Sequence, residues 1–248
     1  MSSDHTKGSR PGTTPDARTP TDDVSGGAHA AGPEGAPIVA PIAGEEDDDA
    51  IDPVDPLTPD EEPEPVTAPP VAVAELAAAC VRFVATRYGV MLDFEPDTLS
   101  LVDQWIVDAR REMPESPQSL DLVQSAAGAY LGEVIRRAFG GMWFADGDHD
   151  GWRVDLSRVY LTFNPIGMTR EALFLETQEG WHAHLEMDPG EREEVERRLE
   201  SLPRVSDEEY FAPTTRFDVV HIAYDALRAK MSAAGLGDVR FGPDDYKK

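Results

Sequence analysis

The sequence predicts an α+β fold in which N-terminal helices pack on a small antiparallel sheet, further helices follow at the C-terminus, and a disordered acidic tail comes first. Three observations favour this class. A proline-rich acidic tract gives way to an apolar helical pattern near Pro69, the apolar spacing changes from about 3.6 to about 2 after Gly140-Gly141, and helical spacing returns after Asn164-Pro165. We expect a disordered Pro-rich tail over residues 1–69, a single α+β domain over 70–243 and a flexible C-terminus over 244–248.

The first 69 residues carry too much charge and too few apolar side chains to build a core. The net charge of the chain is −26 at pH 7, and half of it falls before Pro70, where 16 acidic residues stand against three Lys and Arg. From Glu45 to Glu64 there are eleven carboxylates, no Lys or Arg, and four prolines. Such a segment can neither collapse nor hold a helix, so we expect it to be extended and disordered.

The same acidity restricts the partners of the chain. Nucleic-acid binding needs clustered Lys and Arg, whereas this chain has only short arginine pairs that a solvated helix face explains. We therefore expect no direct binding to nucleic acid. The tail has two interpretations: it keeps the domain soluble and spaced from its neighbours, or it competes for a basic surface as a mimic of nucleic acid.

The sequence shows no sign of export or of a membrane segment. The amino terminus has no apolar run behind its charges, so no secretory signal is expected. The longest apolar stretch, 71–85, is too short to span a membrane and contains Glu75 and Arg82. The single cysteine, Cys80, fits a reducing interior and is expected in the core. We expect a soluble, cytoplasmic protein that does not bind a membrane.

Three helices are expected to open the domain. The first covers residues 72–88, where apolar residues recur at helical spacing, and it should be largely buried. The second follows Asp97 as its N-cap and carries an apolar stripe over 99–113. The third begins with Ser116 as N-cap and Pro117 in the first helical position, carries arginines in its last turn, and ends at the glycine pair.

The remaining elements alternate between strands and helices. After the glycine pair, alternating apolar residues predict the strands of an antiparallel meander over 142–145, 152–156 and 159–163. Helices then return, and they are expected from Asn164-Pro165 to a stop at Gly180, on the surface after Asp188-Pro189, and from Phe217 to a stop at Gly235.

Two stretches of this domain carry a resemblance to a family. LDFEPDTLSLVDQWI and SLDLVQSAAGAYLGEVIRRAFGGMW resemble the opening half of small uncharacterised bacterial domains, in which two helices lead through a Gly-Gly stop into a sheet. The resemblance covers roughly residues 91–163 only. It implies an α+β fold, and it carries no activity and no functional residue over to this chain.

The strongest chemical motif runs from Asp146 to Gly151 with the sequence DGDHDG. Carboxylates at alternate positions followed by a glycine open a calcium loop, so Asp146, Asp148 and Asp150 are candidate metal ligands, with calcium as the candidate cation. A full loop needs a glutamate at its twelfth position, which here is Ser157, and it needs flanking helices. A solvated turn between two strands is the alternative, because Asp and Gly favour turns for backbone reasons alone.

Four histidines form a second candidate group. His182 and His184 stand two residues apart on an expected strand, so both imidazoles would point the same way and could share a metal with His149 or His221. Exposed histidines at a sheet edge are the alternative, because no zinc-site spacing fixes a third ligand.

Two carboxylates are candidates for a shifted pKa. Glu133 lies beside the apolar face of the third helix, and Asp155 lies on an expected strand. A structural ion pair, formed by Glu133 with Arg137 at i, i+4, is the alternative to a catalytic acid.

Known catalytic motifs are missing from the chain. There is no G-x-S-x-G elbow, no phosphate loop, no G-x-G-x-x-G and no paired cysteine, so no catalytic or cofactor-binding residue is assigned. These absences and the acidity favour a non-catalytic interaction module that binds a protein partner through its domain, aided by the tail where the partner is basic. Two alternatives stay open: an immunity-type inhibitor of a basic toxin, and a metal-dependent enzyme or calcium-binding protein that uses the Asp146–Asp150 turn.

Overall fold

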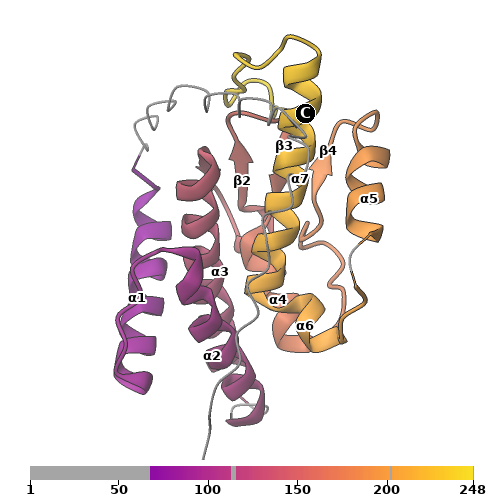
Figure 1. Ribbon diagram of the computed structural model, residues 1–248. Coiled ribbons are helices and arrows are strands. Elements are labelled where there is room, and N and C mark those ends of the chain that lie inside the picture. Colours follow the sequence, from indigo (N-terminus) through magenta and orange to yellow (C-terminus); the bar gives the residue numbers. More distant parts are fainter. Residues whose placement is uncertain (1–67, 113–115, 202, 248) are drawn as a thin grey trace, which may run out of the picture. The chain divides into compact units, whose positions relative to one another are not determined.

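Three helices open the part of the chain that the structure describes. The structure is a computed structural model that describes residues 68–112, 116–201 and 203–247 (Figure 1). The expected tail up to residue 67 lies outside this part, as do Met113 and Leu202. The three expected helices are confirmed: α1 (Val71–Tyr88), α2 (Leu99–Glu112) and α3 (Pro117–Phe139).

The entry into α2 differs from the expectation. Asp97 is not an N-cap, because the chain first forms a 3₁₀ turn, η1 (Pro96–Thr98), whose N-cap position is Glu95. Asp97 lies in the first turn of η1, where its negative charge faces the positive end of the helix dipole. The turn follows Phe94, which has a left-handed φ of 69°.

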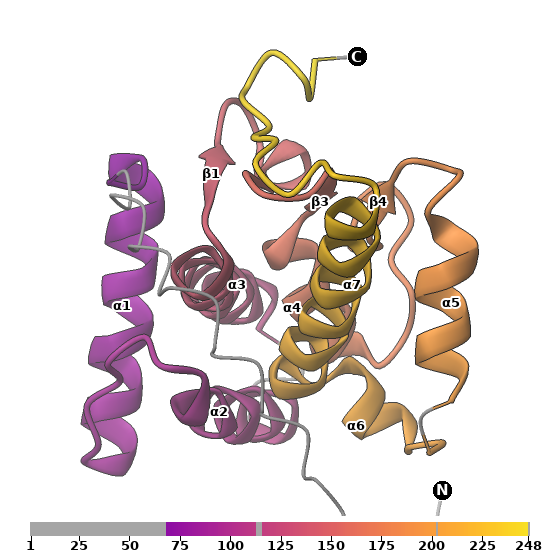
Figure 2. The same ribbon diagram turned by 45° about the horizontal axis from the view of Figure 1, so that its top comes forward.

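Helix α3 forms the centre of the core, with α1 on one side and α7 (Pro213–Ala233) on the other (Figure 2). Every residue of α3 from Val123 to Arg136 is buried. Two glycines permit this close packing, because a Cβ at Gly128 would lie 2.5 Å from Ile166 Cα and one at Gly132 would collide with the Trp143 ring. The helix ends at Gly140, with φ 74°, as expected.

The sheet has four antiparallel strands in chain order, β1 (Gly141–Phe144), β2 (Arg153–Leu156), β3 (Leu161–Phe163) and β4 (Glu186–Met187). The expected three-strand meander is confirmed, and the two-residue β4 extends it. On the inner face, Trp143 pairs with Val154 and Val154 with Phe163, and these side chains meet the helices. On the outer face, the register aligns the pairs Phe144 and Arg153, Asp155 and Thr162, and Thr162 and Glu186.

Helices return after β3, as expected, with differences at their ends. Helix α4 (Pro165–Phe174) begins at the expected Asn164 cap but stops at Leu175, which adopts a left-handed φ of 54°, instead of at Gly180. Helix α5 (Arg192–Glu200) lies on the surface, with Val195 as its one buried residue. A further short helix, α6 (Asp207–Phe211), precedes α7.

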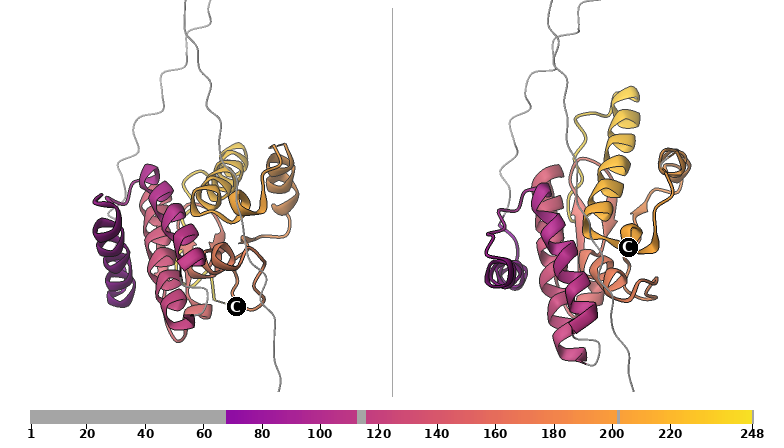
Figure 3. Two further views of the ribbon diagram at one scale, coloured as in Figure 1. Left: turned by 90° about the horizontal axis from the view of Figure 1, so that it is seen from below. Right: turned by 60° about the horizontal axis from the view of Figure 1, so that its bottom comes forward.

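The C-terminal segment packs against the outer face of the sheet. The Tyr246 side chain is 4% exposed, stacks on Tyr160 and donates a hydrogen bond of 2.7 Å to the Leu156 carbonyl. The packed structure therefore reaches beyond the expected domain end at residue 243 and into the segment that we expected to be flexible. All described residues belong to one compact unit, with α1 to α3 towards one side and α5 and α7 towards the other (Figure 3).

No helix in the described ranges is both long and apolar enough to cross a membrane.

Candidate functional site

The aspartate turn, residues 146–151, joins β1 to β2 and is held through its backbone. The buried Asn164 donates from Nδ2 to the His149 carbonyl at 2.9 Å and to the Asp150 carbonyl at 3.1 Å. Trp152 donates from Nε1 to the Gly147 carbonyl at 3.1 Å. The backbone of the turn is thereby fixed, while its three aspartate side chains remain exposed.

The three aspartates do not form a metal-binding cluster in this conformation. Within residues 68–112, 116–201 and 203–247, no group of three or more His, Cys, Asp or Glu side chains is arranged to hold a metal ion. The turn contains a 3₁₀ turn, η2 (His149–Gly151), in which the Gly151 N–H bonds the Asp148 carbonyl at 3.0 Å. Metal binding by Asp146, Asp148 and Asp150 stays a prediction.

A cleft of about 570 Å³, here named the acidic cleft, lies between α1, the first turns of α3 and the aspartate turn. Its lining combines three apolar side chains with three carboxylates. They are Leu76, Leu122, Trp181, Asp121, Asp148 and Asp150. The cleft therefore places two of the predicted metal ligands, Asp148 and Asp150, near Asp121 of α3 and near apolar side chains from three separate segments. The third predicted ligand, Asp146, does not line the cleft.

His149 connects the turn to α3 at the inner side of this cleft. Its Nδ1 lies 3.0 Å from Ser125 Oγ, and its ring meets the Trp152 ring edge-on with centroids 4.5 Å apart. Burial lowers the His149 pKa below its ordinary value of 6.5, although Asp148, Asp121 and Asp150 act in the opposite direction. The lowered pKa favours the neutral imidazole, which does not offset the carboxylates around it.

Trp181 is positioned by an arginine behind it. The Arg170 guanidinium lies 4.8 Å from the centroid of the Trp181 ring, and its Nη1 donates to Gln124 Oε1 at 3.0 Å. This cation–π contact fixes the indole where it lines the cleft.

The expected histidine group is not assembled. His182 and His184 do not lie on a strand, and His182 has a left-handed φ of 48°, so the expectation of a shared strand face is wrong. His182 contacts Glu186 at 3.3 Å on the outer face of the sheet, and His184 lines a separate cavity beside α5. His221 pairs with Asp225 on α7. Nothing in these positions brings the four imidazoles to one metal.

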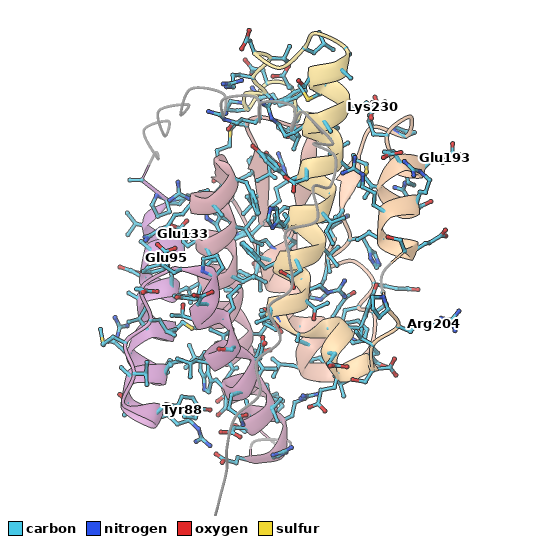
Figure 4. All side chains as sticks on the ribbon, viewed as in Figure 1. Tyr88, Glu95, Glu133, Glu193, Arg204 and Lys230 are labelled. Atoms are coloured by element: carbon cyan, nitrogen blue, oxygen red, sulfur yellow. The ribbon has the colours of Figure 1, made fainter. Side chains whose placement is uncertain are left out.

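Glu133, which is labelled in Figure 4, is buried and takes part in a hydrogen-bonded network. It accepts hydrogen bonds of 2.8 and 2.9 Å from Arg136 Nε and Nη2, and one of 2.8 Å from Trp143 Nε1. The expected partner Arg137 lies farther away, with its Nε 3.6 Å from Glu133 Oε2. The carboxylate oxygens of Glu133 are already occupied by the donors of Arg136 and Trp143, which supports a structural ion pair at this position.

Asp155 lies on the outer face of the sheet next to a cavity of about 480 Å³. Its carboxylate accepts from Thr162 Oγ1 at 2.6 Å and from Arg153 Nε at 3.0 Å. Burial raises the Asp155 pKa, and these two donors oppose the shift. The lining comes from four strands, the C-terminal segment, the end of the aspartate turn and His182, so no single local sequence pattern marks this cavity.

Comparison with known proteins finds a similarity to a family whose function is unknown. Residues 57–154 match a family model described as "Family of unknown function (DUF6278)". The match includes α3 and the aspartate turn, and it agrees with the expected resemblance to an uncharacterised family, although it begins upstream of residue 91 and ends within β2. Searches of curated proteins and of solved structures gave no match.

Proposed function

We propose that this protein is an interaction module that binds a basic, amphipathic segment of a partner protein in the acidic cleft. The observation that carries this proposal is the composition of the cleft. Three exposed carboxylates, Asp121, Asp148 and Asp150, border the apolar side chains of Leu76, Leu122 and Trp181.

The apolar part of the cleft would supply most of the affinity. Leu122 is 44% exposed, and Leu76 and Trp181 are partly exposed beside it. Leucine and tryptophan side chains around a hollow can be removed from water by an apolar side chain of the partner, which contributes roughly 25 cal/mol for each Å² of apolar surface buried. A partner helix or strand with one apolar face meets this requirement.

The charges would select the partner. The lowered pKa of His149 favours its uncharged form, so the three carboxylates of the cleft favour Lys and Arg at the rim of the bound segment. Charges at the rim of an interface act on specificity and on the association rate more than on the affinity. An acidic or neutral segment of the same shape should bind more weakly.

The acidic tail would extend this selection beyond the cleft. Its eleven carboxylates between Glu45 and Glu64 add to the negative field of the domain and would attract a basic partner over about one Debye length, roughly 8 Å at physiological salt. The same acidity argues against direct binding to nucleic acid. A cytoplasmic location is part of the proposal, and the buried, unpaired Cys80 supports it.

The cleft is tested by calorimetric titration of the full chain with an amphipathic leucine–lysine peptide and with its leucine–glutamate counterpart. We expect the lysine peptide to bind, and a variant with Asn at Asp121, Asp148 and Asp150 to weaken the binding by about tenfold or more, which is about 1.4 kcal/mol. The matched control replaces three exposed aspartates elsewhere, Asp97, Asp218 and Asp238, by Asn. Equal loss in both variants would mean that only total charge matters, and the cleft would not be the site.

The contribution of the tail is tested separately in the full chain. Its eleven carboxylates between Glu45 and Glu64 are replaced by Asn and Gln, and association with the lysine peptide is followed by stopped flow at low and high salt. We expect slower association at low salt and no difference at high salt, because added salt screens the tail. Unchanged rates at both salt concentrations would remove the tail from the proposal and leave the cleft.

A further inference from the structure

A cavity of about 250 Å³, here named the arginine pocket, lies between α5, α7 and residues 183–187. We propose that it binds a small organic acid, a monocarboxylate with an apolar body, and that Arg216 receives the carboxylate. None of the residues that line this pocket lines the acidic cleft, so the inference goes beyond the proposed function and does not depend on it.

Arg216 is a buried cation that its protein partner only partly satisfies. Its side chain is 6% exposed, and its Nη2 donates to the buried Glu171 Oε2 at 2.8 Å. Its Nε has no hydrogen-bond partner. A guanidinium offers five N–H donors, and among the described residues Glu171 alone accepts a hydrogen bond from it. Buried donors are rarely left unmatched, so this N–H beside a cavity is open to an acceptor that enters the cavity.

Two aromatic rings hold the guanidinium in place. Its central carbon lies 4.5 Å from the centroid of the Tyr210 ring and 5.2 Å from that of the Phe211 ring. These contacts and the pair with Glu171 fix the orientation of Arg216 before any ligand arrives. A preorganised guanidinium can bind a carboxylate with little loss of side-chain entropy.

The rest of the pocket selects a single negative charge on an apolar body. Besides Arg216, the lining contains two basic side chains, His184 and Arg192, and one acidic side chain, Glu196. This excess of basic groups contrasts with the net charge of −26 of the whole chain. Most of the remaining lining is apolar, and it includes Met168, Val195, Leu199 and Val219. A guanidinium can bind one carboxylate through two parallel N–H···O bonds, and inorganic phosphate has no apolar body to fill the rest of this lining.

The volume limits the size of the acid. Pockets for drug-sized ligands measure about 300–1,000 Å³, and this one lies just below that range. Hexanoate places a short apolar chain behind one carboxylate, and it is therefore the probe that we choose.

The experiment follows the melting temperature of the full chain during titration with hexanoate, with hexan-1-ol, with acetate and with inorganic phosphate. We expect hexanoate to raise the midpoint, and the rise to grow with the logarithm of its concentration above Kd, because a ligand of the native state stabilises it by mass action. The alcohol lacks the charge, acetate lacks the apolar chain, and phosphate is charged but has neither a carboxylate nor an apolar chain, so each should give a smaller rise. No rise with hexanoate, or an equal rise with hexan-1-ol, would overturn the proposal.

Three variants test whether hexanoate raises the melting temperature by binding in the arginine pocket. Val219→Phe fills the pocket, and the double change Glu171→Gln with Arg216→Gln removes both buried charges together. Val239→Phe, at an exposed valine outside the lining, is the matched control. We expect the hexanoate shift to disappear in the first two and to persist in the control. If the double variant does not fold, Val219→Phe decides: a full shift in that variant would place the binding elsewhere and refute the arginine pocket.

Discussion

The side-chain amide of Asn164 donates a hydrogen bond of 2.9 Å to the His149 carbonyl, so a buried residue at the start of α4 holds the aspartate turn. The same side chain accepts through Oδ1 from the N–H groups of Ile166 and Gly167 at 2.9 and 3.0 Å. One asparagine therefore caps a helix and fixes one wall of the acidic cleft.

We expect Asn164→Ala to lower the free energy of unfolding by about 2–4 kcal/mol, because it removes a helix cap and leaves buried backbone groups unpaired. Asn164→Asp should also destabilise the protein, since a carboxylate can cap α4 but cannot donate to the His149 carbonyl. Urea denaturation measures both. Ser116→Ala is the control, because Ser116 is the N-cap of α3 but makes no side-chain cap bond. A loss in Asn164→Ala no larger than in this control would show that the cap and the turn are not coupled.

Gly128 lies where α3 meets α4, and alanine at this position should destabilise the protein. In an exposed helix, Gly→Ala stabilises by up to about 1 kcal/mol. Here a Cβ would lie 2.5 Å from Ile166 Cα and 2.8 Å from Thr169 Oγ1, and overpacking of a core costs about 1–3 kcal/mol. We expect a lower melting temperature for Gly128→Ala and no drop for Gly237→Ala, which has open space around it. A rise in Gly128→Ala would contradict this packing.

Much of the fold follows from local sequence patterns. The helical apolar period predicts α1, α2, α3 and α7, because it extends over several turns in each of them. The change of period at Gly140-Gly141 predicts the meander, because the apolar residues that follow alternate as in strands. Short elements escape such patterns. Strand β4 has two residues and α6 has five, so neither is long enough to repeat its apolar period. The end of α4 at Leu175 carries no glycine signal, because a leucine adopts the left-handed conformation there.

The candidate site follows less from the sequence. The aspartate turn is visible as a motif, but the cleft beside it is formed by Leu76, Leu122 and Trp181, which are far apart in the chain. Only tertiary packing brings them together. The same applies to Arg216 and Glu171, which pair over 45 positions and share no local spacing.

His149 should make the stability depend on pH. Its pKa is lowered in the folded protein, mainly by burial, so the unfolded chain binds more protons in the range just below the ordinary value of 6.5. The free energy of unfolding should therefore rise with pH through that range and fall as the pH drops below about 6.5. We expect His149→Gln to remove this component, measured by urea denaturation between pH 5 and 8. An identical pH dependence in the variant would assign it to other groups.

Divalent cations should have little effect on the folded protein if the aspartate turn keeps its present conformation. Because no cluster of ligands is assembled among the described residues, we expect millimolar calcium, magnesium or zinc to leave the melting temperature of the full chain unchanged relative to a chelator. The double variant Asp146→Asn with Asp148→Asn separates the turn from the carboxylates of the tail. A rise in the wild type that this variant abolishes would establish the predicted metal site.

The most direct test of the acidic cleft is a nuclear magnetic resonance titration of the labelled full chain with the amphipathic leucine–lysine peptide. We predict that the Trp181 indole signal and the amide signals of Leu122 and Ser125 shift together as the peptide binds, and that these shifts are lost in the variant with Asn at Asp121, Asp148 and Asp150. Shifts confined to residues 45–64, or to a surface outside the acidic cleft, would contradict the proposed function.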